Sequence, residues 1–141
     1  MKRLYYLASL FFVCTLPAII VAFFVWDRIP LLNLGLFVIG IVVFGSIWDI
    51  WATPHGKRDK VWLWQFHEEE TLGVKLFSLP IEEYLFFMST SLYIVFLWEG
   101  IRFALETQNM LMYIVIPFAG VWSLVCILIP YKLKMKGDRV L

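Results

Sequence analysis

The chain has 141 residues, of which 62% are hydrophobic and 16% charged, and its formal net charge is +1. This apolar content is far above that of an ordinary soluble domain. A nearly neutral charge argues against a nucleic-acid partner, which normally requires a basic patch. The length favours one domain over residues 1–141. The composition therefore predicts an all-α integral membrane protein.

Four apolar stretches are long enough to cross a bilayer, which takes about 20 residues per helix. The first stretch follows Lys2 and Arg3, but its apolar run is longer than that of a signal peptide, so we expect a membrane span. Pro17 lies inside this span and is a candidate kink, which membrane helices tolerate. We expect the spans at about residues 4–26, 31–51, 80–104 and 110–131.

The Lys and Arg residues gather on one side of this arrangement. Only Arg28 and Arg102 fall on the other side. By the positive-inside rule, both termini are therefore cytoplasmic, and we expect a multi-pass protein of the cytoplasmic membrane. The basic residues on the cytoplasmic side are Lys2, Arg3, Lys57, Arg58, Lys60, Lys75, Lys132, Lys134, Lys136 and Arg139.

The connection between the second and third spans, residues 52–79, is then cytoplasmic and unusually aromatic. It carries Trp62, Trp64 and Phe66 beside an acidic run at residues 68–70. One interpretation is an interfacial aromatic belt next to a solvated acidic turn. The other is a loop that folds back against the membrane face and covers a pocket. The sequence leaves both interpretations open.

Two adjacent carboxylates, Glu82 and Glu83, follow Pro80 at the start of the third span. Proline suits the first helical turn because its missing N–H would have no partner there. The positive helix end favours ionised carboxylates, whereas burial beside lipid favours the neutral acid. A carboxyl group that is subject to both of these opposing effects is a candidate proton donor. Adjacent helical residues point about 100° apart, so one would face a pocket and the other would tune it.

Asp49 ends the second span at the same membrane depth, so we expect three carboxylates to converge. Gly45 and Ser46 precede it by one turn and would allow a neighbouring helix to approach closely. Ionisable groups inside a membrane are costly, which makes a functional site the default hypothesis. The alternative is that the glutamate pair lies among lipid headgroups and that Asp49 pairs with Lys57 or Arg58.

One face of the third span is acidic at its start and aromatic further in. The sequence contains no His-rich or Cys-rich spacing for a metal and no Gly-rich phosphate loop. We therefore predict neither a metal nor a nucleotide cofactor. The residues that share this face by helical spacing are Glu82, Phe86, Ser89, Tyr93 and Phe96.

These residues carry a resemblance to a known family. The segment LPIEEYLFF at residues 79–87, with Asp49 upstream, resembles the small membrane lycopene cyclases, whose signature is Pro-x-Glu followed by Glu or Asp. This family includes bacterial heterodimeric and archaeal or fungal fused carotenoid cyclases. The resemblance covers roughly residues 31–98. The other matching residues are Gly56, Trp62, Phe66 and Thr71-Leu72-Gly73.

The resemblance implies an isomerase of the intramolecular lyase type. A carboxylic acid protonates the terminal double bond of an acyclic carotene such as lycopene, the neighbouring alkene closes a six-membered ring, and loss of a proton gives a β-type end. No redox change and no cofactor are implied. Glu82 or Glu83 would be the acid, and the second carboxylate or Asp49 would orient it or take part in proton return. The implied substrate-binding residues are Pro80, Trp62, Trp64, Phe86, Ser89 and Tyr93.

Fused family members carry two copies of the domain, whereas this chain has one copy and a fourth span. The resemblance therefore implies a second cyclase-domain subunit or self-association. Two other functions stay open. One is a non-catalytic membrane subunit that binds a carotenoid or quinone. The other is a small proton-relay or transport protein, which would space its carboxylates along the membrane depth and is disfavoured because they cluster.

Overall fold

The computed structural model describes residues 4–52 and 71–137, with side chains described for Leu4 and for residues 6–52 and 71–128. Four helical segments are long and apolar enough to cross a membrane, and they confirm the four predicted spans: Tyr6–Arg28, Leu31–Ala52, Ile81–Thr107 and Met110–Leu128. The elements are α1 (Tyr5–Leu10), the π-helix η2 (Phe11–Thr15), α2 (Leu16–Val25), the 3-10 helix η3 (Trp26–Arg28), α3 (Leu31–Ala52), β1 (Lys75–Leu76), β2 (Leu79–Pro80), α4 (Ile81–Thr107) and α5 (Met110–Gly137).

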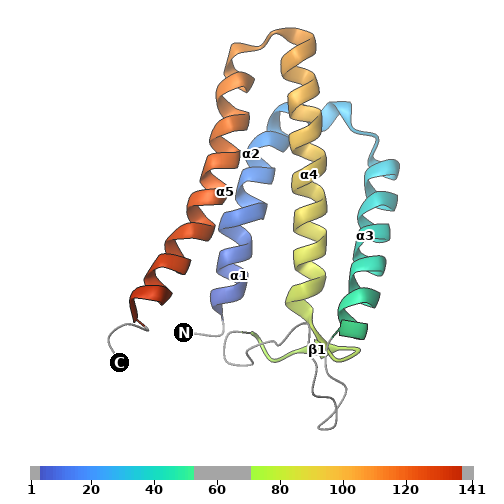
Figure 1. Ribbon diagram of the computed structural model, residues 1–141. Coiled ribbons are helices and arrows are strands. Elements are labelled where there is room, and N and C mark those ends of the chain that lie inside the picture. Colours follow the sequence, from blue (N-terminus) through green and yellow to red (C-terminus); the bar gives the residue numbers. More distant parts are fainter. Residues whose placement is uncertain (1–3, 53–70, 138–141) are drawn as a thin grey trace.

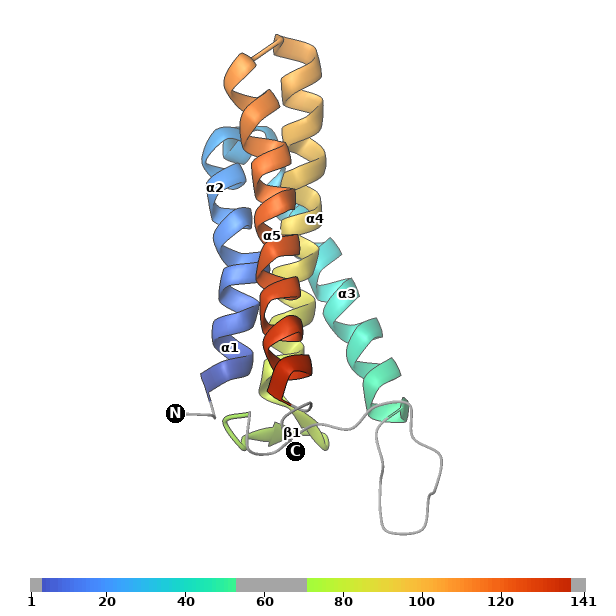
Figure 2. The ribbon, with the colours of Figure 1, turned by 60° about the vertical axis from the view of Figure 1, so that its left-hand side comes forward.

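Helix α4 is the centre of the bundle. It packs against α3 on one side and against α2 and α5 on the other (Figures 1 and 2). The start of α1, the end of α3, the start of α4 and the end of α5 lie at the same end of the molecule (Figure 1). Because this end contains the predicted acidic site, we call it the carboxylate end, and the opposite end the distal end. Successive spans therefore run in opposite directions (Figure 1).

The first span contains a π-helix just before Pro17. Proline has no N–H to donate to the carbonyl of Val13, four residues earlier. That carbonyl instead accepts a hydrogen bond of 2.7 Å from the Ser123 hydroxyl of α5. The Trp122 indole N–H donates to the carbonyl of Phe12 over 2.9 Å. Helix α5 thus supplies the polar partners that an irregular helix needs inside a membrane.

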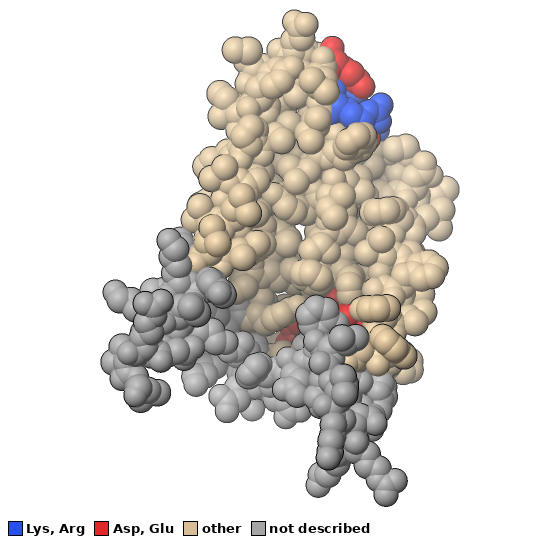
Figure 3. All heavy atoms as spheres, in the orientation of Figure 1, with Lys and Arg blue, Asp and Glu red and all other residues tan. Residues whose placement is uncertain are grey.

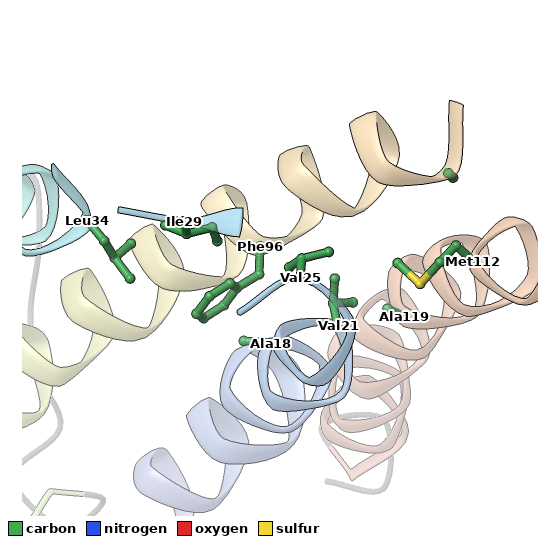
Figure 4. Packing of buried hydrophobic residues seen from close by; sticks show 9 residues of the cluster. Ala18, Val21, Val25, Ile29, Leu34, Phe96, Met112 and Ala119 are labelled. Carbon is green, nitrogen blue, oxygen red and sulfur yellow. The ribbon is translucent and has the colours of Figure 1, made fainter. Parts of the chain in front are cut away.

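The apolar core lies mainly in the distal half of the bundle. In Figure 4, Val21 of α2 lies between Phe96 of α4 and Met112 of α5. Gly100 makes this approach possible, because a Cβ atom there would lie 3.0 Å from Val21 Cγ1. The buried members of this core are Ala18, Val21, Val25, Ile29, Leu34, Phe96, Ala104, Met112 and Ala119.

Helix α3 packs closely against α4 at Gly45. A Cβ atom at Gly45 would lie 2.5 Å from the ring of Phe87, which is too close for any side chain. Gly40, one and a half turns earlier on α3, has no atom within 4 Å of its corresponding position. The close approach expected from Gly45 is therefore present, and it brings the end of α3 against the start of α4.

We expect Gly45→Ala to destabilise the protein by about 1–3 kcal/mol, the usual cost of overpacking. Gly40→Ala is the matched control, and we expect it to be neutral or stabilising, because alanine favours a helix over glycine by about 1 kcal/mol. Thermal unfolding of the two variants in detergent measures the difference. Equal effects of both substitutions would show that Phe87 moves away at little cost.

Candidate active site

A short hairpin lies directly before α4 at the carboxylate end. Strands β1 and β2 are antiparallel, with Lys75 opposite Pro80 and Leu76 opposite Leu79. The two turn residues, Phe77 and Ser78, have φ of 49° and 72°. Positive φ at both positions is typical of a two-residue type I′ hairpin, and these are strained values for residues other than glycine.

Several hydrogen bonds join this hairpin segment to the first turn of α4. The Ile81 N–H donates to the Val74 carbonyl over 3.0 Å, and the Tyr84 hydroxyl donates to the Leu76 carbonyl over 2.9 Å. The segment therefore covers the start of α4 and the side chains that begin there. Of the predicted aromatic loop, Trp62 and Trp64 lie outside the described residues.

Glu82 is fully buried beneath this segment, with an exposed fraction of 0%. The sequence suggested that Pro80 lies within the first turn of the helix, but Pro80 is the residue just before it. Glu82 is therefore the second residue of α4. The backbone N–H of Leu72 donates a hydrogen bond to Glu82 Oε1. The second oxygen, Oε2, is buried without a hydrogen-bond partner among the described residues. Buried polar atoms without partners are rare in folded proteins.

Glu83 is also buried but has a different partner. The hydroxyl of Tyr6, at the start of the first span, donates a hydrogen bond of 2.7 Å to Glu83 Oε1. The two adjacent carboxylates are therefore distinct: a backbone amide holds Glu82, and a phenol holds Glu83. Tyr6 is absent from the sequence-based set, because a tyrosine at the end of a span is typical of the interfacial aromatic belt.

Asp49 completes the acidic cluster from the end of α3. Its side chain is 8% exposed, and it is near enough to Glu83 and Tyr6 to interact with both electrostatically. The hydroxyl of Ser46, one turn earlier, is buried without a partner among the described residues. Three different spans thus bring Tyr6, Asp49 and the glutamate pair together. On the face drawn in Figure 3, acidic atoms are visible near this end, beside uncharged side chains of the described residues.

The other predicted site residues lie at varied distances from this acidic cluster. Pro80 is buried in β2 beside the cluster. Phe86 is 38% exposed and stacks edge-on against Phe87, with ring centroids 5.6 Å apart. Tyr93 points away toward α5, where its hydroxyl donates to the Ala119 carbonyl over 3.1 Å. Ser89 is buried and faces the first span.

A cavity of about 560 Å³ lies between the first span and α4. Its only described polar lining residues are Asp27 and the pair Thr15 and Ser89, whose hydroxyl oxygens are 3.3 Å apart. Apolar side chains, including Trp26 and Phe96, form the rest of its walls. A volume of this size is typical of a small-molecule site, for which about 300–1,000 Å³ is usual.

The fold and the site define a four-span membrane protein with a buried acidic cluster at one end of an apolar bundle. Among the described residues, no group of three or more His, Cys, Asp or Glu side chains is arranged to hold a metal ion. The buried carboxyl groups and the Tyr6 hydroxyl of the cluster can transfer protons and stabilise positive charge.

This chain belongs to the lycopene cyclase family. A family model described as lycopene cyclase matches residues 3–101, from the start of the first span to the distal part of α4. The match confirms the resemblance of the LPIEEYLFF segment, and it supports a carotenoid cyclase function in general. Helix α5 lies beyond the matched residues. Searches of curated proteins and of solved structures found no match.

Proposed function

We propose that this protein closes an end ring of an acyclic carotene, such as lycopene, by proton transfer from Glu82. The observation that carries this proposal is the carboxyl group of Glu82, fully buried and with Oε2 unpartnered among the described residues. An alkene carbon is a poor acceptor, so an acid that must protonate it benefits when no better acceptor competes for its proton. Oε1 is fixed by the Leu72 N–H, which leaves Oε2 as the oxygen that carries the proton.

The reaction then conserves atoms and electrons. The Oε2–H bond of Glu82 breaks as a C–H bond forms at the inner carbon of the terminal double bond, which leaves a tertiary carbocation at the outer carbon. The π electrons of the neighbouring alkene form the new C–C bond and close a six-membered ring. Ring closure leaves a second tertiary cation at the other carbon of that alkene. A base then removes a proton from the ring carbon next to it, and the C–H electrons become the ring double bond. The product is an isomer of the substrate, so no oxidant or reductant is consumed.

Glu83 is the group that we assign to stabilise the cation and accept the returning proton. The hydrogen bond from Tyr6 fixes the orientation of the Glu83 carboxyl group and favours its charged form. Asp49 adds a second carboxylate close to Glu83. Fixed negative groups stabilise a developing positive charge most strongly where water is excluded. The two neighbouring glutamates thus have different roles because they have different partners.

Aromatic rings and a dry environment complete the proposed site. The faces of Phe86 and Phe87 can stabilise a carbocation by cation–π attraction, and Trp62 and Trp64 of the connecting loop are proposed to contribute in the same way. The hairpin segment covers the cluster, which keeps water from quenching the cation. Tyr93 points to α5, so we propose that it acts through the packing of the bundle.

We further propose that the carboxylate end is cytoplasmic, as the distribution of Lys and Arg predicts, and that the protein lies in the cytoplasmic membrane. A second cyclase-domain subunit, or a second copy of this chain, is the partner that the family suggests. The family match supports a carotenoid substrate. Carotenoids stay in the lipid phase, so we propose that the protein takes its substrate directly from the membrane.

Pigment analysis in a lycopene-accumulating bacterial host tests the proposed function. The chain is expressed alone and together with any neighbouring cyclase-like gene. We expect monocyclic or bicyclic carotenes with the same mass as lycopene. Unchanged lycopene in both expressions, with the protein folded and inserted in the membrane, would contradict a lycopene cyclase and direct attention to the carotenoid-binding alternative.

A further inference from the structure

The cavity between the first span and α4 is aligned with the acidic cluster. Glu82, Ser89 and Phe96 are all buried and are spaced by seven residues along α4, so they lie on one face of the helix. Ser89 and Phe96 line the cavity, and Glu82 lies below it, about 10 Å from Ser89 along the helix axis. One continuous face of α4 therefore runs from the carboxyl group into the cavity.

The described walls of the cavity suit a long, slender hydrocarbon. Small side chains, Ala18 and Ala22, line the side of the first span, while Leu92 and Phe96 line the side of α4. Helix α5 packs on α2 and α4 at Val21 and Gly100, neither of which lines the cavity. Every described lining residue belongs to the first span or α4, and none belongs to α3.

We propose that this cavity binds the polyene chain of the substrate, lengthwise across the membrane, while its reacting end lies at Glu82. The inference rests on the proposed function, because it assigns the rest of the same substrate molecule. The distance from Glu82 to Phe96 along α4 is about 21 Å, compared with a hydrocarbon layer of about 30 Å. The chain of a rod-like carotene thus continues from the cluster toward the distal end, where Trp26 and Asp27 line the cavity.

Two features favour the polyene over an ordinary lipid tail as the occupant. The cavity lies on the same face of α4 as a buried acid, which offers nothing to a saturated acyl chain, and the chain belongs to a family described as lycopene cyclase. In its polar pair, the Thr15 hydroxyl donates a hydrogen bond to the Ser89 oxygen, so a hydrocarbon that passes the pair does not break this bond. This pair marks the boundary between the acidic cluster and the cavity.

Binding can be measured separately from catalysis. Lycopene is achiral, so it shows circular dichroism in its visible band only when a chiral site holds it. We would titrate the purified full-length chain, carrying Glu82→Gln, with lycopene in phosphatidylcholine vesicles. We expect an induced signal with this variant and with the wild type. Ala22→Phe fills the cavity and should raise the lycopene concentration at half-saturation by about ten-fold or more. Ala22→Val, a smaller change, should show a smaller loss in the same direction.

Ala8→Phe is the matched control, because Ala8 lies on the same span but is exposed outside the cavity. It should bind lycopene like the parent protein. Equal binding by the Ala22 and Ala8 variants would overturn the cavity proposal. A wild-type protein that cyclises lycopene but gives no induced signal would also overturn it, and would indicate that a lipid tail occupies the cavity. Binding that is lost on filling the cavity, in a protein that never cyclises lycopene, would support the cavity and contradict the proposed reaction.

Discussion

Glu82→Gln is expected to abolish ring closure, with a loss of about 10²–10⁴-fold, the usual contribution of a general acid. Glutamine keeps the shape of the side chain and can still accept the Leu72 N–H, but it has no acidic proton for an alkene. Because the side chain is fully buried, the isosteric change avoids a cavity. Rates of product formation by purified wild-type and variant protein measure the effect.

Glu99→Gln on the same helix is the control for Glu82→Gln. Glu99 pairs with Arg102 at 2.9 Å near the distal end, and such exposed pairs contribute little. We expect nearly wild-type turnover from this control. Retained activity in Glu82→Gln would move the role of acid to Glu83. Full activity in both Glu82→Gln and Glu83→Gln would contradict an acid function for the motif.

Tyr6→Phe is expected to lower turnover by about 10–100-fold, since a hydrogen bond to a charged group contributes about 1.5–3 kcal/mol. The substitution removes only the hydroxyl that donates to Glu83. Because the phenol is not among the cavity residues, KM should change little while kcat falls. Glu83→Gln should cost more, since it removes the proton acceptor itself.

Tyr113→Phe provides the comparison for Tyr6→Phe, because Tyr113 is 46% exposed on α5. It should leave kcat unchanged. A purely structural role for Tyr6 would instead lower the amount of folded protein, or raise KM, without a specific loss in kcat. Either result would remove Tyr6 from the proposed chemistry and leave Glu83 without a positioning partner.

The membrane spans could be predicted well from the sequence, because their signal is continuous hydrophobicity over the width of a bilayer. The boundaries were less accurate. Helix α4 runs to Thr107, three residues beyond the predicted end, where Gln108 adopts a left-handed conformation with φ of 51°. The Asn109 side chain then accepts a hydrogen bond of 3.0 Å from the Leu111 N–H and caps α5. These polar residues end one helix and begin the next, whereas hydropathy alone marks only the apolar part.

The hairpin before α4 could not be predicted, because its turn residues are Phe77 and Ser78. Turns with positive φ usually contain Gly, Asn or Asp, and neither residue gives that signal. The hydrogen bonds from Ile81 and Tyr84 to this segment are contacts that a sequence pattern does not reveal. They explain why Glu82 is fully buried at a position where a solvated helix start was equally plausible.

The acidic site was predictable in part. Asp49 and Glu83 interact electrostatically, as their positions at the ends of neighbouring spans suggested. Tyr6 was not predictable, because the contact joins residues 77 positions apart. Tyr93 shows the converse problem. Helical spacing assigns it to the face of Glu82, yet its hydroxyl bonds to Ala119 and lies 3.0 Å from Ser123 Oγ. A helical face is broad, and the neighbouring helices decide which of its residues line the site.

The most direct test of the account is a single turnover in heavy water. Purified protein is equilibrated in D₂O and mixed in excess with lycopene, with no reductant and no nucleotide, and the products are analysed by mass spectrometry. Proton donation by a carboxyl group of the protein predicts one deuterium per ring closed, and no cyclic product from the Glu82→Gln variant. Cyclic product without deuterium, or product only after a reductant or nucleotide is added, would contradict acid-catalysed cyclisation.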